Sequence, residues 1–193
     1  MKTVNILLSG VGGQGVILAS KILSQAALLQ GLDIKQSEVH GMSQRGGSVV
    51  SHVRIGDVVH SPLVPEGGCD ILVGFEPLEA LRYAHWVRPE GTIIYSVDRI
   101  NPSTVSAGFA EYPEDIGQRL GRFPCTSFAV AAGDLAEQAG NRRSANVVLV
   151  GTLADRLFFP EEIWEKALEA SVPPKLLPLN REAFRLGRGA GQG

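Results

Sequence analysis

The chain has 193 residues, of which 44% are hydrophobic and 20% charged, and its formal net charge is −2. This length and composition are typical of one globular domain that is large enough to bury a sizeable core. The weak negative charge argues against a nucleic-acid-binding protein, which usually has a basic face and a high pI.

The two cysteines, Cys69 and Cys125, lie far apart and form no CxxC pattern. Iron–sulfur and zinc sites need several closely spaced thiolates or thiolate–imidazole sets, so this sequence alone builds neither. We interpret both residues as buried free thiols in a reducing compartment. Asn5, Ser9 and several glycines interrupt the first apolar run, and no run approaches the length of a membrane span. We therefore expect a cytoplasmic protein.

The first elements are a strand, a glycine loop and a helix. Residues 4–9 are mostly aliphatic, as in a buried strand, and residues 16–29 repeat apolar positions at helical spacing. The unpaired N–H groups and the dipole at the start of such a helix bind anions, most often phosphate, and glycines admit the ligand. The alternative is a turn whose glycines serve packing alone. The candidate cofactor-binding residues in this loop are Gly12, Gly13, Gln14 and Gly15.

A second glycine-punctuated loop follows a second strand, which we predict at residues 32–37. Residues 38–47 show neither helical nor strand periodicity and are predicted as a loop. Arg45 is its best phosphate or carboxylate ligand, because a guanidinium binds such oxygens in pairs. His40 titrates near neutrality and is a candidate acid or base, although no nucleophile or carboxylate pair is visible beside it. The other candidate cofactor-binding residues in this loop are Ser43, Gln44 and Gly46.

Further strands and helices complete an α/β pattern. Residues 48–55 and 58–60 predict a hairpin around the turn Gly56-Asp57. The later predicted elements are strands at 71–74, 91–97 and 108–112, and helices at 76–87, 128–138, 145–158, 160–170 and 181–186.

This order predicts a three-layer α/β/α fold with a mixed, mostly parallel sheet that contains an antiparallel hairpin. We expect a single domain over residues 1–186 and a flexible glycine-rich tail over residues 187–193.

The first loop also fits the G-x-G-x-x-G fingerprint of dinucleotide-binding domains, with Glu38 where such domains carry a ribose-binding acid. A stand-alone NAD(P)- or flavin-binding oxidoreductase is therefore one candidate. Against it, the second strand leads into a polar loop and a hairpin, where a dinucleotide-binding half has a second crossover helix. Gly13 and Gln14 also add features that the fingerprint does not require, and no catalytic set for hydride transfer is visible.

The two loops together are more specific than either one alone. The motif GVGGQG at residues 10–15, followed by EVHGMSQRGGSV at residues 38–49, resembles the gamma-type domain of the 2-oxoacid:ferredoxin oxidoreductases. The form HGMSQRGG is similar to the beta-subunit branch of that family that acts on indolepyruvate. The resemblance extends over most of the chain and includes residues 146–151 and 180–184.

The resemblance implies that several subunits share the chemistry. Such enzymes convert a 2-oxoacid, coenzyme A and oxidised ferredoxin into an acyl-CoA, CO2 and reduced ferredoxin, using thiamine diphosphate, Mg and [4Fe-4S] clusters. This sequence has neither the Gly-Asp-Gly…Asn motif of thiamine enzymes nor cluster cysteines, so an alpha subunit is expected to carry these cofactors.

The chain is then an accessory beta-type subunit, inactive alone, that shapes the active site and helps to bind coenzyme A. Ferredoxin is expected to meet the assembled complex. A purely structural docking domain is the remaining alternative.

Overall fold

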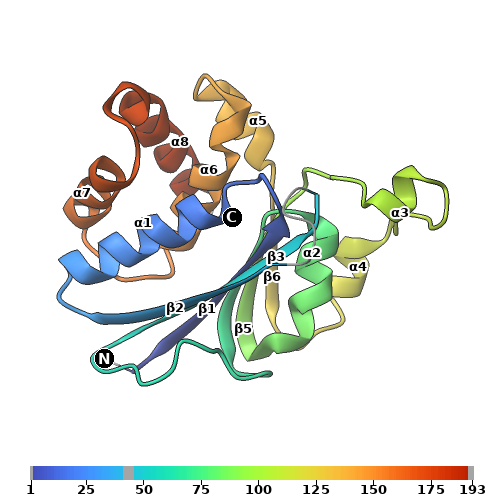
Figure 1. Ribbon diagram of the computed structural model, residues 1–193, viewed down its shortest axis with the longest axis horizontal. Coiled ribbons are helices and arrows are strands. Elements are labelled where there is room, and N and C mark those ends of the chain that lie inside the picture. The colour runs from blue at the N-terminus through green and yellow to red at the C-terminus, as the bar shows by residue number, and fades with distance from the viewer. Residues whose placement is uncertain (1, 41–45, 191–193) are drawn as a thin grey trace.

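The computed structural model describes residues 2–40 and 46–190, and within them six strands form one sheet in the order β2-β3-β1-β4-β5-β6 (Figure 1). The strands are β1 Val4–Val11, β2 Asp33–His40, β3 Ser48–Gly56, β4 Cys69–Gly74, β5 Val87–Ser96 and β6 Thr126–Val130. Strands β1, β4, β5 and β6 pair in parallel, whereas β3 is antiparallel to both of its neighbours. The mixed, mostly parallel sheet confirms the prediction.

Helices cover both faces of this sheet (Figure 1). They are α1 Val16–Leu29, α2 Pro77–Tyr83, α3 Ser103–Ser106, α4 Ile116–Leu120, α5 Ala132–Gln138, α6 Ala145–Ala154, α7 Glu161–Ser171 and α8 Leu177–Ala190. Short 3-10 turns lie at Ala84–Trp86, Arg142–Ser144 and Pro174–Leu176. Helices α1, α6, α7 and α8 lie on one side and α2 and α4 on the other, which confirms the three-layer architecture.

The alternation of side chains along β1 divides the core in two. Ile6 and Leu8 face the larger cluster beneath α1 and α6–α8, whereas Leu7 faces the smaller cluster beneath α2 and α4. Trp164 of α7 is fully buried in the larger cluster, with its ring 5.6 Å from the rings of Phe159 and Phe184. Both faces of the central strands are therefore apolar, as parallel strands between helix layers require.

The antiparallel hairpin exists, but its predicted residues are wrong. Strand β2 pairs with β3 from Asp33 opposite Gly56 to His40 opposite Val49, so residues 38–40 belong to a strand and the connection is shorter than predicted. Residues 58–60 form no strand. The reason is that β1 and β2 already occupy both edges of β3, which leaves no edge for the returning chain. Asp33 instead holds that segment by accepting a hydrogen bond from the Val59 N–H at 2.9 Å.

Other parts of the chain also differ from prediction. Residues 126–130 form the edge strand β6 where a helix beginning near residue 128 was expected, and residues 108–112 are not a strand. The glycine-rich tail is wrong for residues 187–190, because α8 continues to Ala190. Packing explains this: Gly187 lies against the backbone of α6, and Arg188 forms an ion pair with Asp155 at 3.0 Å. Residues 191–193 lie outside the described part of the chain.

Candidate functional site

The first glycine loop lies at the carboxyl edge of the parallel strands, where open α/β sheets bind ligands. Gly15 precedes α1 in the left-handed conformation, with φ 77° and ψ 26°. Because glycine has no side chain, it makes no capping hydrogen bond to the first turn of α1. The leading amide groups of α1 are therefore available to an external acceptor at the positive end of the helix dipole.

The two predicted loops meet at this edge. The Gly12 N–H donates to the carbonyl oxygen of Gly47 at 2.9 Å, and the Gly46 N–H donates to the carbonyl oxygen of Gly12 at 3.4 Å. The amide of Gly12 is thus used to join the loops rather than left for a ligand. The candidates Ser43, Gln44 and Arg45, and the side chain of His40, lie outside the described residues.

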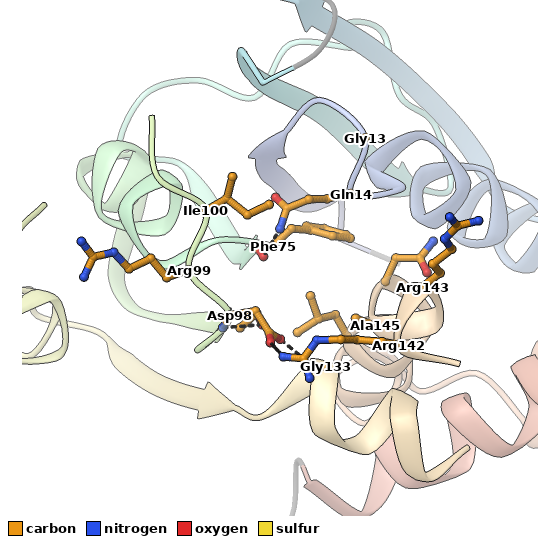
Figure 2. Close-up of a pocket in the computed structure, with 13 residues that line it drawn as sticks. Gly13, Gln14, Phe75, Asp98, Arg99, Ile100, Gly133, Arg142, Arg143 and Ala145 are labelled. Carbon is orange, nitrogen blue, oxygen red and sulfur yellow. Dashed lines mark hydrogen bonds and ion pairs between the residues drawn. The ribbon is translucent and has the colours of Figure 1, made fainter. Parts of the chain in front are cut away.

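Both polar atoms of the Gln14 side-chain amide form hydrogen bonds. Its Nε2 donates to the carbonyl oxygen of Phe75 at 2.7 Å, and its Oε1 accepts from the Val11 N–H at 2.8 Å. Figure 2 shows this side chain lying over Phe75. Gln14 therefore fastens the first glycine loop to the residue that follows β4, which is a positioning role for the loop.

The glycines at positions 13 and 15 are required by backbone geometry. Their φ angles are +105° and +77°, in the region that side chains disfavour. A Cβ atom on Gly15 would lie 2.4 Å from Nδ2 of Asn146, whereas one on Gly13 would meet no atom within 4 Å. Asn146, near the start of α6, donates from Nδ2 to the Gly15 carbonyl oxygen at 3.3 Å. The open space above Gly13 is where a ligand can approach the backbone closely.

A cleft of about 440 Å³ opens beside the first loop (Figure 2). Gly13 and Gln14 form one wall, the residues after β5 form another, and the turn before α6 forms a third. Its charged lining residues are Asp98, Arg99, Arg142 and Arg143. Arg99 and Arg142 are already paired with carboxylates, so Arg143 is the cation that the cleft can offer to an anionic ligand.

The single carboxylate in the cleft is already fully engaged. Asp98 Oδ2 accepts from the Gly133 N–H at 2.7 Å and from the Ser96 hydroxyl at 2.7 Å, and Oδ1 pairs with Arg142, as the dashed lines in Figure 2 show in part. The Asp98 charge raises the pKa of Arg142 above its usual value. Asp98 and Arg142 thus brace the ends of β5 and α5 against the turn before α6.

The three arginines differ in what they already bind. Arg99 stacks over the ring of Tyr112, 3.8 Å from its centroid, and forms an ion pair with Glu114 at 2.7 Å. Arg142 forms ion pairs with Asp98, Asp134 and Glu137. The Arg143 guanidinium, in contrast, has no hydrogen-bond or ion-pair partner in residues 2–40 and 46–190. Arg143 is the side chain best able to give its charge to a ligand. Sequence reasoning missed it, although its neighbour segment, residues 146–151, carried part of the family resemblance.

The described residues contain no group of three or more His, Cys, Asp and Glu side chains placed to hold a metal ion. Cys69 and Cys125 are both unpaired thiols, and burial raises the pKa of Cys69 to about 12. In the same part of the chain, no helix has the length and apolar character needed to cross a membrane.

Comparison with known families matches residues 5–190 to the pyruvate ferredoxin/flavodoxin oxidoreductase family. The chain belongs to this family. Indolepyruvate oxidoreductase subunit IorB of Thermococcus kodakarensis is 43% identical, over 97% of this chain and 95% of its own length. The subunit of the same name from Archaeoglobus fulgidus is 42% identical, over 95% and 92%. These relatives confirm the resemblance drawn from the two glycine loops.

Solved structures of the family share the fold. The gamma subunit of a keto/oxoacid ferredoxin oxidoreductase from Geobacter sulfurreducens superposes with a TM-score of 0.73 at 26% identity, covering 97% of this chain and 98% of its own. A 2-oxoglutarate:ferredoxin oxidoreductase from Magnetococcus marinus, with 2-oxoglutarate, coenzyme A and succinyl-CoA bound, superposes with a TM-score of 0.76 at 20% identity. It covers 100% of this chain and 31% of its own, and it shows the fold alone.

Proposed function

We propose that the chain is the small, beta-type subunit of a thiamine-dependent 2-oxoacid:ferredoxin oxidoreductase whose substrate is indolepyruvate or a related arylpyruvate. Membership of an oxidoreductase family and full-length relatives named as IorB subunits support this assignment. The structural observation that carries it is the joining of Gly12 to Gly46 and Gly47, which sets the two family loops side by side next to the cleft that Arg143 lines.

In this proposal, an alpha subunit carries thiamine diphosphate, Mg and the [4Fe-4S] clusters. The complex converts a 2-oxoacid, coenzyme A and two oxidised ferredoxins into an acyl-CoA, CO2, a proton and two reduced ferredoxins. Thiamine diphosphate supplies the carbanion chemistry when it is bound. The present chain contributes the shape of the site and groups that bind coenzyme A, and we place the complex in the cytoplasm.

The coenzyme A phosphates are assigned to the mouth of the cleft. Gly13 lines both this cleft and the adjoining hollow at Val16 and Ile17, and it leaves space for close approach. Amide groups at the start of α1 supply donors from one side, and Arg143 supplies a charge from the other. The proposed binding set from the two loops remains Gly12, Gly13, Gln14, Gly15, Ser43, Gln44, Arg45 and Gly46. Within it, Gly12 and Gln14 act by holding the loop in place, and His40 stays a candidate acid or base.

The test is isolation of a tagged chain from its native cell, followed by assay of whatever copurifies. A larger thiamine-binding subunit is expected, together with indolepyruvate-dependent reduction of ferredoxin that requires coenzyme A. Mass spectrometry should detect the corresponding aryl-acetyl-CoA. Copurification of no second subunit, or substrate oxidation by the chain alone with a nicotinamide or flavin cofactor, would overturn the proposal.

A further inference from the structure

Helix α2 begins at the carboxyl edge of the sheet with two buried glutamates. Glu76 is 1% exposed and Glu79 is 4% exposed, and neither lines the cleft. A carboxylate is costly to bury unless donors satisfy its oxygens. The donors that meet these two side chains therefore show which parts of the molecule they hold together.

Glu79 contacts both strands that carry the glycine loops. Its Oε2 accepts from the hydroxyl of Ser48, and its carbonyl oxygen accepts from the hydroxyl of Ser9 at 3.2 Å. Ser9 immediately precedes the first glycine loop, and Ser48 immediately follows the second. On the side nearer to solvent, Glu79 Oε1 accepts from Arg82 at 3.2 Å. Glu79 thus ties together the two strand ends from which the loops emerge.

Glu76 extends the same connection to the far wall of the cleft. Its Oε2 accepts from the Glu79 N–H at 3.0 Å, and its Oε1 accepts from the Tyr112 hydroxyl at 2.5 Å and the Ile100 N–H at 3.3 Å. Ile100 lines the cleft, and Arg99 lies over the ring of Tyr112. Burial and the hydrogen bond to Glu76 raise the pKa of Tyr112, so its hydroxyl stays a donor.

We propose that Glu76 and Glu79 are positioning residues that together fix the glycine loops against the cleft wall at residues 98–100. Three consecutive hydrogen bonds make the connection: Ser48 to Glu79, the Glu79 N–H to Glu76, and the Ile100 N–H to Glu76. Because both carboxylates are buried and occupied, they act through these contacts and not on a ligand. The inference rests on the proposed function only in that the loops bind coenzyme A.

The test is a double-mutant cycle on the reconstituted complex, with Glu79→Gln and Ser48→Ala made singly and together. Ser48→Ala removes the hydrogen bond to Glu79, and Glu79→Gln removes the charge that strengthens this bond and the contact with Arg82. Each change should raise the KM for coenzyme A about tenfold, with kcat within about twofold. The KM of the double variant should be no higher than that of the single variant with the larger effect, because both changes act on the contact between Ser48 and Glu79. The matched control is Glu165→Gln on α7, which breaks a partly buried ion pair with Arg181 of α8 and should leave KM unchanged.

Hydrogen exchange on the full free chain provides a second measurement that needs no activity. The amides of Gly12 and Gly46, which join the loops, should exchange faster in Ser48→Ala and Glu79→Gln and unchanged in Glu165→Gln. Ser48→Ala carries the test if Glu79→Gln fails to fold. Unchanged KM and exchange, or additive effects in the cycle, would overturn the proposal. A wild-type complex without coenzyme A-dependent activity would overturn the proposed function instead, and the exchange result would still decide the role of the glutamates.

Discussion

At Gly15 the backbone and a neighbouring side chain both exclude a Cβ atom. Gly15→Ala is expected to lower the free energy of unfolding by about 2–3 kcal/mol, from left-handed strain and the displaced Asn146 hydrogen bond. Gly13→Ala has open space around it and should cost only the strain, about 1–2 kcal/mol. Urea unfolding of both variants measures the difference, and equal losses would contradict the role given to Asn146.

Arg45 is the residue whose predicted role depends most on the assembled enzyme. If it grips a phosphate of coenzyme A or a partner carboxylate, Arg45→Ala should lower kcat/KM about ten- to hundredfold, the range expected for a charge-assisted contact. Lysine should restore part of the loss, since it keeps the charge without the paired donors. Steady-state kinetics with varied coenzyme A, beside thermal melts, provide the measurement. Unchanged kinetics and assembly would make Arg45 an ordinary surface charge.

The buried thiol of Cys69 is expected to make the protein less stable as the pH rises into the alkaline range. Burial raises its pKa from 9.0 to about 12, so between these values the native state keeps a proton that the unfolded state has lost. Stability is therefore lost as pH rises through this window, by about 1.4 kcal/mol per pH unit for one such group. Denaturant unfolding between pH 8 and 11 should show a steeper fall for the wild type than for Cys69→Ala. Parallel curves would contradict this assignment.

At the scale of elements, local sequence patterns determine the bounds of some helices and strands, whereas tertiary contacts determine the bounds of others. The bounds of α1 match the predicted 16–29, because apolar spacing and a glycine start both act within the segment. Strand β6 is decided by its parallel pairing with β5, which no local pattern encodes. The continuation of α8 through glycines 187 and 189 likewise depends on α6, against which the first of them packs.

The crossing of α6 and α8 gives a direct test of that dependence. A Cβ on Gly187 would lie 2.0 Å from the carbonyl oxygen of Val148, so Gly187→Ala should destabilise the protein by about 1–3 kcal/mol through overpacking. Gly189, on the same helix, has nothing within 4 Å, and Gly189→Ala should stabilise by up to about 1 kcal/mol through helix propensity. Thermal melts that move both variants in the same direction would contradict the tight crossing.

For the molecule as a whole, the sequence predicted the layers and the two glycine loops, and the loops meet because β1 and β2 run in the same direction and end at one edge of the sheet. It did not predict the other half of the site. Arg143, Asn146 and the buried glutamates come from distant segments that only the folded chain brings to this edge. These residue types are common on helices and turns, and only the contacts that each side chain makes in the folded chain distinguish it from others of its type.

Because the glycine loops lie at this edge of the sheet, we expect the chain to contact its partner subunit there. Ile17 beside the first glycine loop is 56% exposed, whereas Phe158, between α6 and α7 and beside the start of β1, is 100% exposed. An obligate interface buries on the order of 2,000 Å² or more, and an active site shared between subunits requires it to include the loop edge. Ile17→Glu should therefore weaken copurification of the alpha subunit strongly, and Phe158→Glu much less.

Size-exclusion chromatography and pull-down of both variants give the comparison, with melts to show that each is folded. The isolated wild-type chain should be colourless and inactive, since its sequence lacks cluster cysteines and a thiamine motif. Iron–sulfur or flavin absorption from the pure chain would contradict this reading of the molecule. Loss of the partner in Phe158→Glu alone would move the interface to the opposite end of the sheet, away from the glycine loops.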